Sequence, residues 1–305
     1  MASIQSEILS KVIKGVKPIL TGMHLQQQRA GQAMLSRVKS VPKGIEIVYE
    51  GGCPVNAEWI LPNGAPKDRV MLYMHGGSYR TGDLVASRGL VTYLAKAAGV
   101  KALSFEYRLS PEHQFPDSLK DALAAYRFLL SQGYKSEHIG FIGDSAGGGL
   151  LMATALYLHN HSQPQPGCLM CISPWVDLTE TSESHQRARD KDPLVDSDYL
   201  LQAALDYSGE ESLLNPYISP AFAEYTSDFP PTLIHVGTKE VLYDDAVTLH
   251  QKLTRGGAEA YLEVFEGMWH VWHIFNVPES NEALEKIGAY MREKLQVSAD
   301  AGDEK

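Results

Sequence analysis

The chain has 305 residues, of which 44% are hydrophobic, and a formal net charge of -10. That hydrophobic fraction is ample for a substantial core. The charges are spread along the chain without a long cluster of lysine and arginine, so a nucleic-acid partner is not expected. The three cysteines, Cys53, Cys168 and Cys171, are too few for a disulfide framework and fit a reducing compartment.

No apolar run approaches the ~18 residues needed to cross a bilayer. Residues 1–20 also lack the unbroken apolar stretch of a secretory signal. We therefore expect a cytoplasmic protein without a membrane span. The oligomeric state is left open, with a homo-oligomer as one alternative.

Helical patterns in residues 1–40 precede the first strand-like run. Eight such runs follow, at 45–50, 57–61, 70–75, 101–106, 139–143, 168–173, 232–237 and 260–265. After the first two, they alternate with helical patterns, which predicts a mostly parallel sheet opened by an antiparallel hairpin, with helices on both faces. Cys168 and Cys171 form a C-x-x-C inside one run, and we interpret them as buried strand residues, since no second pair stands at zinc spacing.

The clearest helical pattern is DSLKDALAAYRFLLSQG, at 117–133. Ser118 and Asp121 there resemble a capping box, and Gly133 supplies a stop signal. Further on, the interval from Ser173 to Pro231 is far longer than the dozen or so residues that a βαβ crossover needs. Part of it is therefore an insertion above the sheet.

This insertion and the N-terminal helices together predict a lid. Met23, Tyr199 and Leu200 are candidates to line a pocket beneath it.

The stretch IGFIGDSAGGGLLMA, residues 139–153, places a serine between a strand-like run and an apolar helical run. Its centre, GDSAG, is a G-x-S-x-G pattern in the strand–turn–helix setting of a nucleophile elbow. A tight turn there lifts Ser145 Oγ clear of the backbone, and small neighbours let strand and helix approach closely. The alternative is a phosphate-binding turn, but neither G-x-G-x-x-G nor G-x-x-x-x-G-K-[ST] is present here.

A nucleophilic serine needs a base and an orienting acid, which in this arrangement follow it on loops after later strands. Glu240 stands near the end of the run TLIHVG and is the predicted acid. Asp244 is the alternative, although it also suits the first turn of a following helix. His270 lies closer to the end of the run AYLEVF than His273 does, and is the predicted base.

The tetrahedral oxyanion of acyl transfer needs hydrogen-bond donors. HGGS at 75–78 follows the run VMLYM, and its glycines let backbone N–H groups turn toward Ser145. We expect the oxyanion hole to comprise the N–H groups of Gly76, Gly77 and Ala146.

With these motifs the chain resembles the hormone-sensitive-lipase-like branch of the α/β-hydrolases, a group of carboxylesterases. The similarity is carried by HGG at 75–77, EYRLSPEHQFPDSLKDALAAYRFL at 106–129, GDSAGG at 143–148, SPWVDLT at 173–179, VGTKEVLYDD ending at 245 and GMWH at 267–270. It implies an α/β-hydrolase fold: a mostly parallel eight-stranded sheet with helices on both faces and a helical cap. The expected parts are N-terminal cap helices (1–40), a catalytic domain in two pieces (41–179 and 221–297), a cap insertion (180–220) and a disordered tail (298–305).

Two positions depart from the family pattern. Ser78 stands where a third glycine is frequent, and Glu240 stands where aspartate is usual, although glutamate is an accepted triad acid. The resemblance also implies that Arg108, Glu112 and Asp144 are structural and stabilise loops beneath the site.

The predicted function is that of a serine carboxylesterase acting through an acyl-enzyme, with a Ser145–His270–Glu240 triad. Its partner is a small-molecule ester, and no metal or cofactor is required. The resemblance implies short to medium acyl chains. Two alternatives are an amidase or deacetylase acting on small arylamides, and a non-catalytic ligand-binding receptor of hydrolase fold, which the presence of His270 disfavours.

Overall fold

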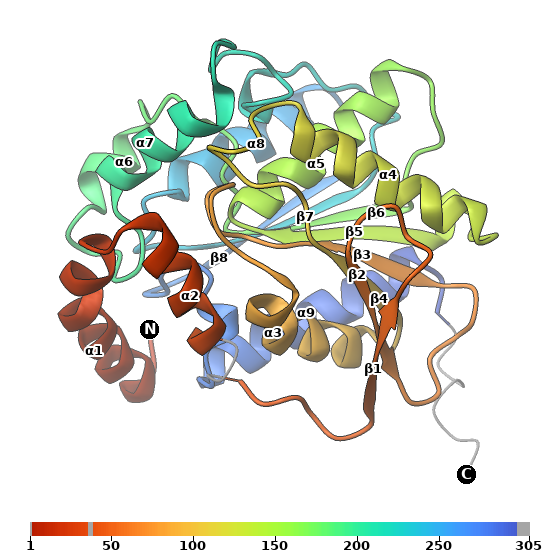
Figure 1. Cartoon of the computed structure of the whole chain (residues 1–305), viewed down its shortest axis with the longest axis horizontal. Coiled ribbons are helices and arrows are strands. Elements are labelled where there is room, and N and C mark those ends of the chain that lie inside the picture. The colour runs from red at the N-terminus through yellow and green to blue at the C-terminus, as the bar shows by residue number, and fades with distance from the viewer. Residues whose placement is uncertain (1, 36–38, 298–305) are drawn as a thin grey trace.

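The computed structural model describes residues 2–35 and 39–297, and its centre is one eight-stranded sheet of order β1-β2-β4-β3-β5-β6-β7-β8 (Figure 1). The strands are β1 (Ile45–Glu50), β2 (Ala57–Pro62), β3 (Val70–Met74), β4 (Lys101–Phe105), β5 (Ile139–Asp144), β6 (Cys168–Ile172), β7 (Thr232–Gly237) and β8 (Ala260–Phe265). The β1–β2 and β2–β4 pairs are antiparallel, and the other neighbours pair in parallel. The predicted sheet and its opening hairpin are therefore confirmed.

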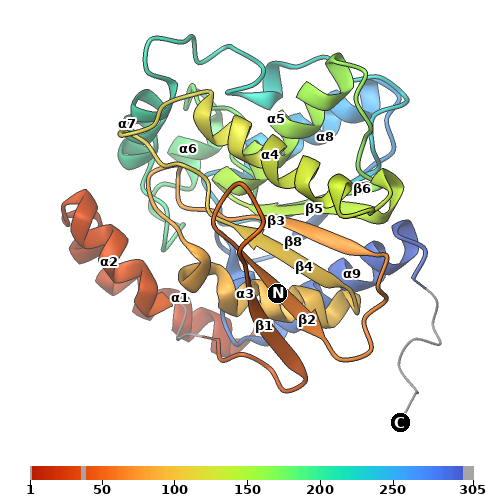
Figure 2. The same cartoon turned by 45° about the vertical axis from the view of Figure 1, so that its right-hand side comes forward.

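Helices cover both faces of this sheet (Figures 1 and 2). One face carries α3 (Leu84–Ala98) and α9 (Pro278–Lys294), and the other carries α4 (Asp117–Ser131), α5 (Ala146–Asn160) and α8 (Tyr243–Arg255). Every residue of the inner strands β3 and β6 is buried, as expected for strands covered on both faces. Cys168 and Cys171 lie on β6 as buried free thiols, as predicted.

Helix α4 begins one residue before the predicted capping box, and that box is not formed. Pro116 occupies the N-cap position without a side-chain cap. Ser118 Oγ instead donates to the Tyr207 hydroxyl at 3.1 Å, and the Asp121 carboxylate accepts from Arg108 Nε at 2.9 Å. Tertiary partners thus use the two side chains that a local reading of the sequence assigns to the cap.

The helices at the N-terminus and in the insertion lie on the same side of the molecule in both views (Figures 1 and 2). They are α1 (Ile4–Thr21), α2 (Leu25–Leu35), α6 (Glu183–Arg187) and α7 (Ser197–Ser208). The two parts are in direct contact, because Lys17 Nζ on α1 donates to the Asp192 carbonyl at 2.9 Å. The residue ranges given for the domains stay predictions, and the tail at 298–305 lies outside the described residues.

In the part of the chain that the structure describes, no helix combines the length and the apolar character that a bilayer crossing requires.

Candidate active site

Ser145 occupies a sharp turn between β5 and α5. Its backbone has φ 54° and ψ -122°, a conformation that non-glycine residues rarely adopt. The turn also requires glycine at its flanks, because a Cβ on Gly147 would lie 2.0 Å from the Met74 carbonyl oxygen. A Cβ on Gly143 would lie 2.5 Å from the Gly147 carbonyl oxygen. The motif therefore has the strand–turn–helix geometry that presents a serine hydroxyl above the sheet.

Ser145 borders a cavity of about 510 Å³, within the usual size of small-molecule sites. The strand-end loops provide its floor, and the two cap segments contribute to its walls. The lining residues within the two cap ranges are Met23, Gln28, Gly31, Lys39, Leu194, Val195, Asp196, Tyr199 and Leu200. Met23, Tyr199 and Leu200, the candidates taken from the sequence, are all among them.

Glu240 and His270 meet at the ends of β7 and β8. Glu240 Oε2 lies 3.1 Å from His270 Nδ1, and the glutamate is fully buried. Its other oxygen, Oε1, accepts from the Gly237 N–H at 2.6 Å and from Ser173 Oγ at 2.8 Å. Asp244 points elsewhere: its carboxylate accepts from the Ser184 N–H at 2.7 Å and pairs with Arg187.

His270 borders the same cavity as Ser145, whereas His273 does not. Since Nδ1 of His270 faces Glu240, its Nε2 is the nitrogen left for chemistry. Within the described residues, no hydrogen bond joins Ser145 Oγ to His270. Hydrogen bonds between catalytic groups are often long before substrate binds, so this does not exclude a nucleophile–base pair. His273 is buried in the core, where its Nε2 lies 3.3 Å from Nδ1 of His235.

The protonation of His270 is set by two opposing effects. Burial lowers its pKa, but the hydrogen bond and negative charge of Glu240, together with the charges of Asp192 and Asp144, outweigh this and raise the pKa above the usual value. The ring is therefore a stronger base than a free imidazole, with Nδ1 held toward the acid.

The loop after β3 carries two of the three predicted oxyanion donors, Gly76 and Gly77, and borders the same cavity as Ser145. The Gly76 N–H donates to Asp144 Oδ1 at 3.1 Å and so already has a partner. Gly77 has φ 121°, and a Cβ there would lie 2.3 Å from the Thr81 carbonyl oxygen, so glycine is required. Ala146 is the first residue of α5, and its N–H has no acceptor within the helix.

The three residues that the resemblance marks as structural each hold a loop. Arg108 pairs with Asp121 of α4, and Glu112 pairs with Arg29 of the cap helix α2. Asp144 lines the cavity and accepts from the Gly76 N–H.

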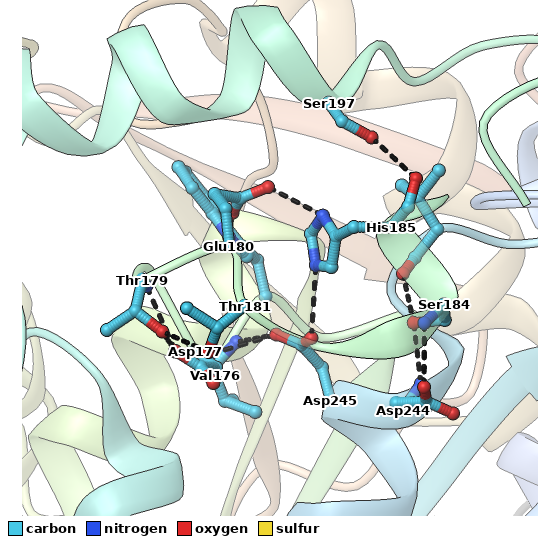
Figure 3. Close-up of polar contacts among 12 residues, drawn as sticks. Val176, Asp177, Thr179, Glu180, Thr181, Ser184, His185, Ser197, Asp244 and Asp245 are labelled. Atoms are coloured by element: carbon cyan, nitrogen blue, oxygen red, sulfur yellow. Dashed lines mark hydrogen bonds and ion pairs between the residues drawn. The ribbon is translucent and has the colours of Figure 1, made fainter. Parts of the chain in front are cut away.

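Sequence reasoning missed two groups of buried polar residues, the first of which lies next to the site. One is Ser173, whose hydroxyl contacts Glu240. The other is a buried cluster in which the His185 ring lies between Glu180 and Asp245 (Figure 3). No local pattern signals either group, because Ser173 and Glu240 come from distant parts of the chain, as do His185 and Asp245, and only Glu180 lies near His185 in the sequence.

Among the described residues, no three or more His, Cys, Asp or Glu side chains are placed to hold a metal ion. The prediction of a mechanism without a metal or cofactor stays a prediction.

Comparison with known proteins agrees with this fold and site. A family model described as alpha/beta hydrolase fold matches residues 71–274, and the chain belongs to that family. An acetyl-hydrolase of Streptomyces hygroscopicus is 40% identical over 255 residues, covering 83% of each chain. An esterase of Acinetobacter venetianus is 32% identical over 230 residues, covering 74% of this chain and 75% of the relative.

Solved structures narrow the assignment further. A crystal structure of an esterase from the bacterial hormone-sensitive lipase family superposes with a TM-score of 0.90 at 34% identity, covering 97% of this chain and 100% of the other. EstE5, in a crystal soaked with p-nitrophenyl butyrate, superposes with a TM-score of 0.90 at 35% identity and the same coverage. The chain is thus a carboxylic ester hydrolase of the hormone-sensitive-lipase-like branch, and not a purely ligand-binding receptor.

Proposed function

We propose that the chain hydrolyses short to medium acyl esters through an acyl-enzyme, with Ser145 as nucleophile, His270 as base and Glu240 as the orienting acid. The observation that carries this proposal is the pairing of His270 Nδ1 with the buried Glu240 carboxylate beside a cavity that Ser145 also borders. This pairing leaves Nε2 free to take the Ser145 proton as Oγ attacks the ester carbonyl. The protonated ring then gives that proton to the departing alcohol, and in a second step activates the water that releases the acid.

The oxyanion donors are proposed with one change from the sequence-based expectation. Gly76 already donates its N–H to Asp144, so its role in the proposal is to hold the loop in place. The N–H groups of Gly77 and Ala146 remain the donors, joined by that of Ser78, which borders the same cavity. Each such donor contributes about 3 kcal/mol to stabilising the oxyanion.

The preference for short acyl chains is supported by relatives. One relative is named an acetyl-hydrolase, and EstE5 crystals were soaked with p-nitrophenyl butyrate. The cavity volume of about 510 Å³ is compatible with such esters. The cytoplasmic location stays a prediction.

Replacing the nucleophile tests the proposal. In Ser145→Ala we expect kcat on p-nitrophenyl butyrate to fall by several orders of magnitude, because no acyl-enzyme can form. Ser104→Ala is a matched control: Ser104 is also buried, but it lies on β4 and does not border the cavity. Esterase activity near the wild-type level in a correctly folded Ser145→Ala would refute the assignment.

A further inference from the structure

We propose that Ser173 is a positioning residue of this site, whose hydroxyl holds the triad acid and the histidine loop in one fixed arrangement. The inference rests on the proposed triad. Ser173 directly follows β6, is fully buried and is absent from the cavity lining. It is therefore expected to act through Glu240 and not on the substrate.

The Ser173 hydroxyl makes two contacts with different parts of the triad. It donates to Glu240 Oε1 at 2.8 Å and accepts from the Val271 N–H at 3.1 Å. Val271 follows His270 in the chain, so one oxygen atom joins the loop after β7 to the loop after β8. The Ser173 hydroxyl is therefore both a hydrogen-bond donor and an acceptor, which fixes the direction of its O–H bond.

These contacts divide the two oxygens of the Glu240 carboxylate between two tasks. Oε1 accepts from Ser173 and from the Gly237 N–H, while Oε2 faces His270 Nδ1. Glutamate has one more rotatable bond than aspartate, the other acid that serves in such triads. Its carboxylate therefore needs more external contacts to keep a single orientation, and Ser173 supplies one of them.

The backbone at Ser173 is held in an unfavourable conformation. Its φ is 46°, in the left-handed region that non-glycine residues rarely occupy, and Val271 at the other end of the hydrogen bond has φ 47°. Such conformations persist where the surrounding structure determines them, and they gather at functional sites. Here the Ser173 N–H is also bound, donating to the His235 carbonyl at 2.8 Å.

The segment that follows Ser173 is anchored independently of the triad. Asp245 Oδ2 accepts from the N–H groups of Val176 and Asp177, at 3.0 and 2.9 Å. The same carboxylate faces the His185 ring, as Figure 3 shows. Removing the Ser173 hydroxyl should therefore leave the course of the chain intact while it frees the Glu240 carboxylate to rotate.

The test compares Ser173→Ala with Ser173→Gly in kcat, KM and melting temperature. Both variants lose the hydroxyl, but glycine adopts a positive φ without strain, so the Gly variant relieves the backbone while the Ala variant does not. We expect kcat on p-nitrophenyl butyrate to fall by about 10- to 100-fold in both, as for a misplaced catalytic group, with KM within about twofold of wild type. The Gly variant should melt at or above the temperature of the Ala variant.

A purely structural role predicts a different pattern. Activity would then follow stability, and kcat would recover in Ser173→Gly along with the melting temperature. That result, or wild-type kcat in either variant, overturns the proposal. Ser145→Ala is measured alongside to separate the two proposals. An inactive Ser145→Ala with fully active Ser173 variants would refute only the positioning role of Ser173. An active Ser145→Ala would refute the triad itself.

Ser219→Ala is the matched control. Ser219 is also fully buried, and its hydroxyl accepts from the Leu178 N–H at 2.9 Å, near the same segment but without touching Glu240. This variant should lose stability and keep wild-type kcat. An equal loss of kcat in Ser219→Ala would show that loosening the segment is sufficient, and would overturn the specific role of Ser173.

Discussion

Whether an acidic residue in this segment contacts His270 depends on its position relative to the end of β7. Glu240 and Asp244 are both acidic and lie four positions apart, yet only Glu240 reaches His270, while Asp244 lies in the first turn of α8 and binds Ser184 and Arg187. The Glu240 carboxylate is fully buried, so its charge acts on His270 with little screening by water.

Replacing each acid separately tests this assignment. Glu240→Ala should lower kcat by about 10⁴-fold, the size of effect seen when a triad acid no longer holds the histidine tautomer. Asp244→Ala, the matched control, removes contacts to Ser184 and Arg187 but none to His270, and should change kcat by less than about threefold. Steady-state kinetics on p-nitrophenyl butyrate at pH 7 measures both, and a larger loss in Asp244→Ala would reverse the assignment.

At the scale of elements, α6 is joined to α8 by the buried cluster around His185 (Figure 3). His185 Nδ1 lies 2.6 Å from Glu180 Oε2, and Nε2 lies 3.5 Å from Asp245 Oδ1. Burial lowers the His185 pKa, but the hydrogen bonds and charges of Asp245 and Glu180 outweigh it and raise the pKa to about 10. The ring therefore carries its proton at neutral pH and balances two buried carboxylates.

This cluster should make part of the folding stability depend on pH. Because the folded pKa of about 10 lies above the 6.5 of an ordinary histidine, the proton stabilises the fold fully below pH 6.5, and the contribution is lost as the pH rises through about 10. The loss in free energy of unfolding caused by His185→Gln should therefore be largest near pH 6 and smallest near pH 10. Urea denaturation at pH 6, 8 and 10 measures it.

His161→Gln serves as the control for that series, because His161 is exposed and lies outside the cluster. The same denaturation series on this variant gives the effect of removing an imidazole outside the cluster. A His185→Gln difference that stays constant from pH 6 to pH 10 would contradict a buried imidazolium.

At the scale of the whole molecule, the cavity depends on two cap segments that are remote in sequence. Arg29 on α2 fastens the N-terminal segment to the loop before α4: Nη1 and Nη2 contact the two Glu112 oxygens at 2.8 and 2.7 Å, and Nε donates to the Arg80 carbonyl. Gln28 and Gly31, which flank Arg29 on α2, line the cavity. The ion pair is therefore placed to set how closely α2 approaches the cavity.

Loosening this attachment should affect substrate binding more than the chemical step. Exposed ion pairs contribute about 0.2–1 kcal/mol, so Glu112→Gln should raise KM by at most about fivefold and leave kcat unchanged. Adding 1 M NaCl should raise KM in wild type and have a smaller effect in the variant. The control is Lys252→Gln, which removes the ion pair between Lys252 on α8 and Glu224. A loss of kcat in Glu112→Gln with unchanged KM would contradict the model.

Much of the fold and the order of the site residues could be predicted from local patterns. The eight strands follow from short apolar runs, and the turn at Ser145 follows from GDSAG between a strand and a helix. The loops that carry Glu240 and His270 could be located because parallel strands end at one edge of the sheet. The capping box predicted at Ser118 is not formed, because the Ser118 hydroxyl binds Tyr207 on α7. That partner is remote in sequence, so no local pattern indicates it.

The sequence by itself thus determined the sheet, the turn at Ser145 and the chain order of Ser145, Glu240 and His270. Each of these follows from the spacing of residues that are close together in the sequence. Only the tertiary structure decided that Gly76 donates to Asp144, that Ser173 joins Glu240 to the Val271 backbone, and that His185 lies between two carboxylates. These contacts join segments between five and ninety-eight positions apart, almost all from different elements. Their geometry depends on how the layers pack, which no local periodicity encodes.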